Sequence, residues 1–120
     1  MKTSSFRLYT GPGRISIARW APRDCPKGFR VFKPLAPGDW SRAHRSWVDY
    51  DTSLRGYAQQ LAAFDPQATY DALTALVAPE EPVLLCWEVP PKYDDGKQWC
   101  HRQQVARWFE QALGIEVGEL

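Results

Sequence analysis

The sequence has little cysteine and little histidine. Three cysteines and two histidines occur in 120 residues, and no two cysteines follow the Cys-x-x-Cys spacing. A zinc site of the finger type is therefore not expected. A metal site made from Cys86, Cys100 and His101 would be irregularly spaced, so no metal site is predicted. The odd number of cysteines favours free thiols in a reducing cytoplasm over a disulfide framework.

Long hydrophobic runs and nucleotide-binding glycine motifs are also missing. The longest uncharged apolar run, residues 83–87, is far shorter than the ~20 residues that span a bilayer. The first five residues read Met-Lys-Thr-Ser-Ser and lead into no apolar segment, so no secretory signal is expected. Residues 11–13, Gly-Pro-Gly, are too short for a Walker or Rossmann motif and contain a proline. These features predict a cytoplasmic protein without a membrane partner. They do not indicate a cofactor or an oligomeric state.

Charge is distributed unevenly along a chain whose net charge is only +1. Residues 1–47 carry ten Lys and Arg against two Asp, a net charge of +8, whereas residues 48–120 carry five against twelve, a net charge of −7. Such an asymmetry is typical of an anion-binding face, and equally of two halves that neutralise each other on folding.

Strand patterns alternate with helical ones along the chain. Strands are predicted at residues 6–10, 15–18, 83–87 and 115–117 from alternating or continuous apolar residues. Apolar residues at helical spacing predict helices from about 47 to 64, from Asp65-Pro66 onwards, and from about 100 to Gly114. This order predicts a single small layered α/β domain over residues 1–120, with a mostly parallel central sheet flanked by helices. A long Pro-, Arg- and Trp-rich loop is expected at about 20–46, packed down by its aromatic residues.

The strand–loop–helix unit from residue 83 to 113 is the strongest candidate for a site. Ligands of open α/β sheets bind beyond the carboxyl ends of the strands, beside helix N-termini. Cys86 and Glu88 lie at such a strand end, and Cys100, His101 and Arg102 lie at the predicted helix start. A helix N-terminus with neighbouring His and Arg stabilises anions and activates a thiol. Cys100 is thus a candidate nucleophile, Arg102 an anion clamp and Glu88 a general acid/base, although a passive helix cap explains the same residues.

The same unit resembles a known family. Residues 84–88 read Leu-Leu-Cys-Trp-Glu, residues 100–102 read Cys-His-Arg, and residues 105–108 read Val-Ala-Arg-Trp. This combination resembles the C-terminal signature of the domain-of-unknown-function 488 family, and residues 16–19 and 35–37 are similar to its shorter forms. The resemblance implies an α/β fold and one site formed by Cys86, Glu88, Cys100, His101 and Arg102, but no reaction. Many relatives carry a Gly-His-Ser turn where this chain has Gly-Pro-Gly at residues 11–13, which removes one partner for Cys100.

A second candidate feature combines aromatic and basic residues. Trp20, Trp40, Trp87 and Trp99 fall in or next to loops, and basic residues surround the first two. Aromatic faces with interleaved arginines stack bases and pair with phosphates, although the same residues also suit a small satellite core under arginine stems. The predicted substrate-binding residues are Arg19, Trp20, Trp87, Trp99 and Tyr9.

Two functions are compatible with these features. The first is an enzyme that acts on an anionic or nucleotide-like substrate through the Cys-His-Arg site. The second is a non-catalytic module that binds nucleic acid or a nucleotide through the basic, Trp-rich N-terminal half. A reactive Cys100 near Glu88 favours the first, and basic residues exposed on one face favour the second.

Overall fold

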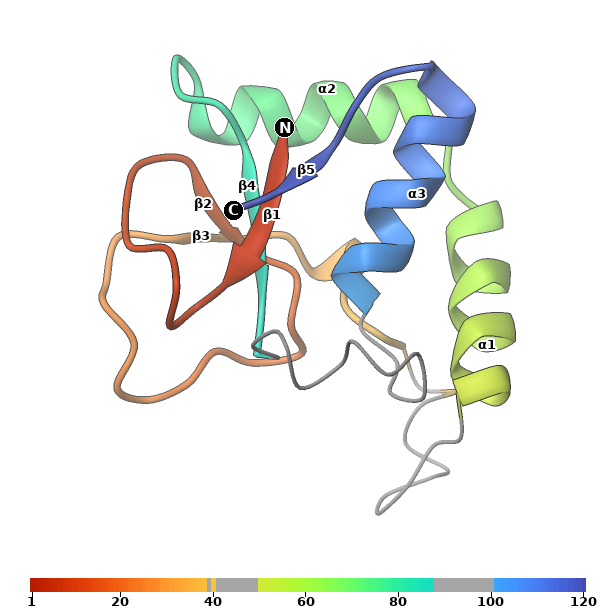
Figure 1. Ribbon diagram of the computed structural model, residues 1–120, viewed down its shortest axis with the longest axis horizontal. Helices are drawn as coiled ribbons and strands as arrows, with labels where there is room; N and C mark the ends of the chain where they lie inside the picture. Colours follow the sequence, from red (N-terminus) through yellow and green to blue (C-terminus); the bar gives the residue numbers. More distant parts are fainter. Residues whose placement is uncertain (39, 41–49, 88–100) are drawn as a thin grey trace.

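The protein is built on a parallel β-sheet. The computed structural model describes residues 1–38, 40, 50–87 and 101–120. Every strand pairing in this part of the chain is parallel, and the strands lie in the order β3-β2-β4-β1-β5 (Figure 1). The strands are β1 (Lys2–Ser5), β2 (Arg14–Ser16), β3 (Arg30–Val31), β4 (Val83–Cys86) and β5 (Gly118–Glu119). The prediction of an α/β fold with a mostly parallel central sheet is confirmed.

Three α-helices and one short 3-10 helix accompany the sheet in the described residues: α1 (Tyr50–Ala62), α2 (Pro66–Val77), α3 (His101–Leu113) and η1 (Lys33–Leu35). The Asp65 carboxylate accepts a hydrogen bond from the backbone N–H of Ala68 at 2.9 Å, so the predicted N-cap of α2 is confirmed. Gly114 follows α3 with φ of +66°, a conformation that glycine adopts without steric cost.

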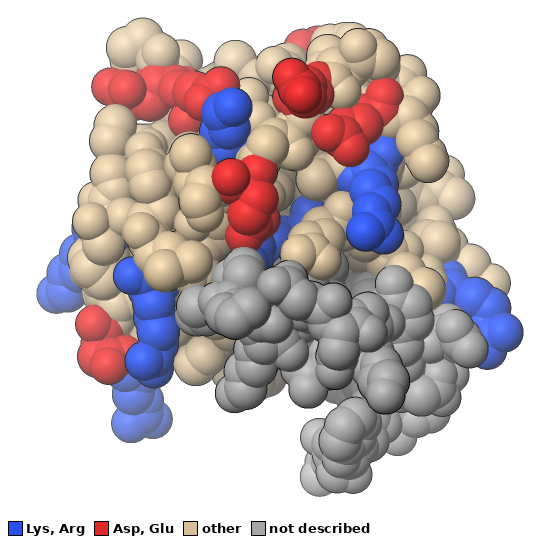
Figure 2. All heavy atoms as spheres, viewed as in Figure 1, with Lys and Arg blue, Asp and Glu red and all other residues tan. Residues whose placement is uncertain are grey.

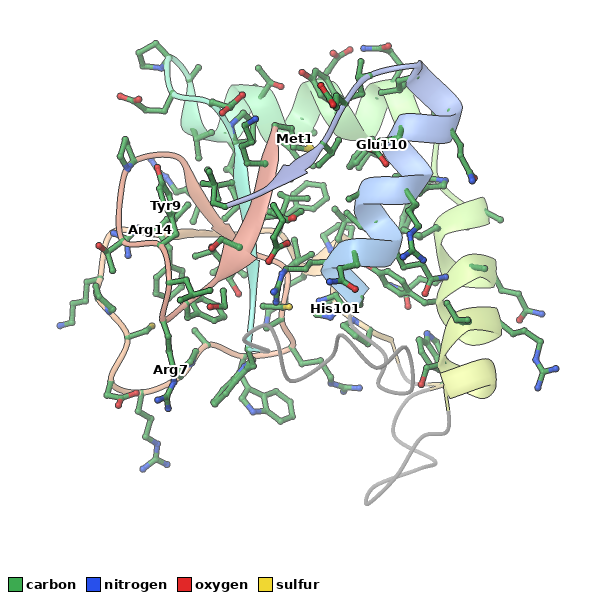
Figure 3. The ribbon with its side chains drawn as sticks, in the orientation of Figure 1. Met1, Arg7, Tyr9, Arg14, His101 and Glu110 are labelled. Atoms are coloured by element: carbon green, nitrogen blue, oxygen red, sulfur yellow. The ribbon has the colours of Figure 1, made fainter. Side chains whose placement is uncertain are left out.

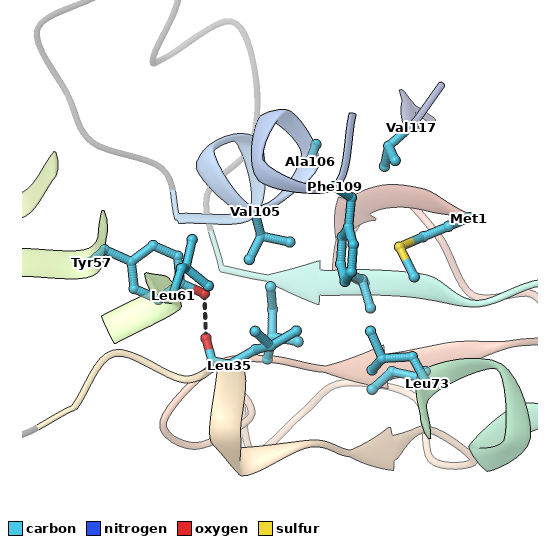
Figure 4. Packing of buried hydrophobic residues seen from close by; sticks show 12 residues of the cluster. Met1, Leu35, Tyr57, Leu61, Leu73, Val105, Ala106, Phe109 and Val117 are labelled. Carbon is cyan, nitrogen blue, oxygen red and sulfur yellow. Dashed lines mark hydrogen bonds between the residues drawn. The ribbon is translucent and has the colours of Figure 1, made fainter. Parts of the chain in front are cut away.

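The two faces of the sheet are covered differently. Leu84 of β4 joins a core cluster that contains Tyr57 of α1, Leu73 of α2 and Phe109 of α3 (Figure 4). Its neighbours on β4, Val83 and Leu85, point to the opposite face, because side chains alternate along a strand, and pack there with residues of loops. The helices thus cover one face, and the loops that follow β1 and β2 cover the other.

The first strand lies earlier than predicted. Residues 6–10 were expected to form a strand, but the strand is Lys2–Ser5, and the chain then turns, with the N–H groups of Leu8 and Tyr9 directed at the Ser5 carbonyl. The apolar residues of 6–10 do not share one face of a strand, since Phe6 is buried under the loops and Leu8 is exposed. The true strand lies between β4 and β5, and its small polar residues Thr3, Ser4 and Ser5 are buried.

Two other strands and the long loop also differ from the prediction. The second strand covers Arg14–Ser16 rather than residues 15–18, and the last covers Gly118–Glu119 rather than 115–117. The segment from residue 20 onwards, predicted as a loop, contains β3 and η1. It is packed down only in part: Leu35 is fully buried and its carbonyl accepts a hydrogen bond from the Tyr57 hydroxyl at 2.5 Å (Figure 4), whereas Trp20 and Val31 are exposed.

Candidate functional site

The carboxyl ends of β1, β2 and β4 meet at one end of the sheet, here called the carboxyl end. Ser5, the last residue of β1, pairs with Cys86, the last residue of β4, and Ser16 of β2 pairs with Leu85. Helix α3 begins here, because Nε2 of His101, its first residue, lies 2.8 Å from the carbonyl oxygen of Ile17, just beyond β2. Parallel sheets bind their ligands at this end.

Arg102 is completely buried and is held by residues of the sheet. Its Nη1 donates to Cys86 Sγ at 2.9 Å. Its Nε and Nη2 donate to the Glu119 carboxylate of β5 at 2.7–3.1 Å. The Thr3 hydroxyl donates to the same carboxylate at 2.6 Å. The guanidinium therefore binds Glu119 and Cys86 inside the protein, and its role as an anion clamp stays a prediction.

His101 anchors the start of α3 to the sheet. Its side chain is buried, and Nε2 faces the Ile17 carbonyl, which only accepts hydrogen bonds, so this nitrogen carries the proton. The imidazole also packs edge-on against the Tyr57 ring, with centroids 5.6 Å apart. These contacts fix the position of α3 and place Arg102 above Cys86.

The other residues predicted for catalysis and binding near this unit, Glu88, Trp99 and Cys100, lie outside the described residues. The structure thus brings together Cys86, His101 and Arg102 from that candidate set.

Two exposed tryptophans lie at the carboxyl end. Trp20 follows β2 and is 65% exposed, and Trp87 follows β4 and is 47% exposed. Because β2 and β4 are neighbours, the two loops meet, and Trp87 Nε1 donates to the Trp20 carbonyl at 2.8 Å. The Arg19 guanidinium lies over the Trp20 ring, 5.5 Å from its centroid, and also donates to the Gly38 carbonyl. Trp20 and Trp87 with Arg19 form a surface that we call the indole platform.

Tyr9 and Trp40 occupy other places. The Tyr9 hydroxyl donates to the Pro12 carbonyl at 2.7 Å, and Figure 3 shows Tyr9 beside Arg14, at the amino end of β2 and away from His101. Trp40 is partly buried against the helix-side core, and its Nε1 donates to Gln60 Oε1 at 2.7 Å. Of the predicted binding residues in the described part of the chain, Arg19, Trp20 and Trp87 lie together, and Tyr9 lies apart from them.

Acidic residues precede two of the strands. Glu80 and Glu81 precede β4, and Glu116 precedes β5, so these carboxylates lie where the strands begin. Figure 2 shows several acidic side chains at that end, with basic side chains beside them. Arg7 and Arg19 follow β1 and β2 and lie at the carboxyl end. Arg7 and Arg19 thus place positive charge at this end, where the exposed Asp24 also places a carboxylate.

Glu119 and Thr3 were missed by the sequence analysis. A buried arginine requires an acidic partner, so an acidic partner for Arg102 could have been expected if its burial had been predicted. The closing strand was placed at residues 115–117, however, which left Glu119 outside the sheet. Only the pairing of β5 with β1 brings Glu119 beside Thr3 and under Arg102.

The described residues contain no group of three or more His, Cys, Asp or Glu side chains placed to hold a metal ion. In the same part of the chain, no helix is long and apolar enough to cross a membrane. No family model, no curated protein and no solved structure matches this chain.

Proposed function

We propose that the protein binds a nucleotide or a single-stranded nucleic acid at the carboxyl end of its sheet, with a base stacked on the indole platform. The observation that supports this proposal is that two exposed tryptophans follow neighbouring strands and are held together by the hydrogen bond from the Trp87 indole N–H to the Trp20 carbonyl. Base–aromatic stacking contributes about 1–3 kcal/mol per base and accepts any base. Arg19 adds positive charge at the same place for a phosphate.

The alternative explanation, that the tryptophans cover a small core, applies to only some of them. Trp40 is half-buried and hydrogen-bonded to Gln60, as a structural tryptophan should be. Trp20 and Trp87 instead expose about half or more of their surface to water. The exposed part of each indole contributes no burial of apolar surface to the stability of the fold. A ligand that stacks on them would remove this apolar surface from water.

Replacing Trp20 by alanine should weaken the binding of a mixed-sequence oligodeoxynucleotide by about 5- to 150-fold, equivalent to the ~1–3 kcal/mol of one stacked base. Fluorescence anisotropy of the labelled oligonucleotide at low salt measures the affinity, and Trp20→Phe should restore much of it. Leu120→Ala is the matched control, because Leu120 is 50% exposed and lies just beyond β5. Failure of the wild-type protein to bind nucleotides or oligonucleotides, or unchanged binding by Trp20→Ala, would refute the proposal.

A second candidate function is a thiol-dependent enzyme for an anionic substrate, with Cys86 as the nucleophile. The specific observation in its favour is the 2.9 Å contact between Arg102 Nη1 and Cys86 Sγ. A guanidinium has only donors, so the sulfur is the acceptor, and a cation beside sulfur stabilises the nucleophilic thiolate. The resemblance of the Leu-Cys-x-Glu and Cys-His-Arg motifs to the domain-of-unknown-function 488 family agrees with a shared site here.

If Cys86 is a thiolate nucleophile, iodoacetamide at neutral pH should modify it faster than Cys25, although Cys86 is buried and Cys25 is partly exposed. Peptide mass spectrometry measures both rates in one sample, and the rates in the unfolded protein provide the reference. If Cys86 is modified more slowly than Cys25 after this normalisation, Cys86 has a structural role, and nucleotide binding is the one remaining candidate function.

A further inference from the structure

A cavity opens on the loop-covered side of the sheet. Its volume is about 290 Å³. It lies between the turn that follows β1 and the loop that follows β2. Arg7, one of its lining residues, is labelled in the lower part of Figure 3. The cavity is lined by Phe6, Arg7, Thr10, Pro22, Asp24, Cys25 and Pro26. None of these residues belongs to the indole platform or to the Arg102 network.

The cavity adjoins the indole platform. Pro22 lines the cavity and is only two residues beyond Trp20, so their Cα atoms are at most about 7 Å apart. Ala21, which lies between them, packs against the loop-side core. If one nucleotide stacks on Trp20, the nucleotide covalently joined to it can therefore reach the cavity.

The lining suits a nucleobase better than a phosphate. Phe6, Pro22 and Pro26 supply apolar walls for the faces of a planar ring. The Asp24 carboxylate only accepts hydrogen bonds, so it matches the exocyclic amino group of adenine, cytosine or guanine and repels a phosphate. Arg7, also on the lining and exposed, offers a guanidinium for the adjoining phosphate. Within the described part of the chain, neither Arg7 nor Asp24 forms an ion pair.

We infer that the cavity is a second base subsite, so that the ligand is a single strand of at least two nucleotides. One base stacks on the indole platform, and the neighbouring base enters the cavity with its amino group on Asp24. This inference rests on the proposed binding function and deepens it, because it distinguishes a single-stranded nucleic acid from a mononucleotide.

Cys25 provides a direct probe, because it lines the cavity and is partly exposed. The experiment uses the full chain carrying Cys100→Ser, in which the remaining cysteines are Cys25 and the buried Cys86. Modification of Cys25 by N-ethylmaleimide is followed by peptide mass spectrometry. A deoxycytidine tetranucleotide at about ten times its Kd should slow this modification about tenfold, in proportion to occupancy. Deoxycytidine monophosphate should change tryptophan fluorescence without protecting Cys25 to that degree.

Two comparisons test the base chemistry. A thymidine tetranucleotide lacks an exocyclic amino group, so it should protect Cys25 less than the deoxycytidine tetranucleotide at equal occupancy of the platform. Asp24→Asn should remove this preference, whereas Asp71→Asn, at an exposed carboxylate of α2, should leave it unchanged.

The outcomes separate the inference from the proposed function. If the tetranucleotide changes tryptophan fluorescence but leaves Cys25 unprotected, the platform binds and the cavity is no subsite. If the mononucleotide protects Cys25 as well as the tetranucleotide does, one nucleotide fills the cavity and the two-base arrangement is wrong. If neither ligand changes tryptophan fluorescence, the proposed function itself fails, and the inference fails with it.

Discussion

Replacing Phe109 by alanine should lower the free energy of unfolding by about 3–5 kcal/mol, the usual range for truncating a buried phenylalanine. Phe109 is fully buried in α3 and belongs to the cluster that joins the helices to Leu84 of the central strand. Its ring meets the Tyr70 ring of α2 edge-on, with centroids 6.0 Å apart. The alanine variant therefore loses buried apolar surface and leaves a cavity between α2, α3 and the sheet.

Urea denaturation followed by circular dichroism measures this loss. Gln111→Ala is the matched control, since Gln111 is exposed on the same helix and its replacement should change stability by no more than about 0.5 kcal/mol. If Phe109→Ala costs no more than this control, the helix-side core is not organised around α3 as described.

Replacing Arg102 by alanine should lower the free energy of unfolding by about 3 kcal/mol, near the lower end of the range for breaking a buried ion pair. The substitution removes the guanidinium that binds Glu119 of β5 and Cys86 of β4. It leaves the Glu119 carboxylate without its cationic partner, although this side chain is 31% exposed and keeps some contact with water. Partial hydration is the reason for expecting the lower value.

Arg107→Ala is the control for this prediction, because Arg107 is exposed on the same helix. Its loss should change stability little, whereas Arg102→Ala should shift the midpoint of urea denaturation clearly. A stability of Arg102→Ala equal to that of Arg107→Ala would show that the guanidinium does not stabilise the packed interior, and a role as an anion clamp would then be the better interpretation.

The Arg102 network also changes how the candidate site is understood. The sequence places Arg102 beside Cys100 and suggests that both serve a substrate. In the fold, α3 directs Arg102 inward, where it joins β4 to the edge strand β5. Arg7 and Arg19 lie in the loops after β1 and β2 and carry further positive charge at the carboxyl end.

Local signals in the sequence were sufficient for the helices and for the central strand. Asp65-Pro66 and Gly114 mark helix ends because their capping preferences depend on the adjacent backbone alone. The apolar run at residues 83–87 predicts a buried strand because a strand covered on both faces needs apolar side chains in succession; the strand covers Val83–Cys86, and Trp87 beyond it is exposed. The core positions Leu61 and Phe109 follow from helical spacing, and both are buried.

Tertiary structure alone decided the first strand and the site. Lys2–Ser5 has no apolar pattern, and it forms a strand because β4 and β5 supply partners for its backbone on both sides. The pairing of Glu119 with Arg102 and the contact of Trp87 with Trp20 join residues 17 and 67 positions apart. Capping and periodicity act within a few residues, whereas these contacts depend on the order of strands in the sheet, which no local signal encodes.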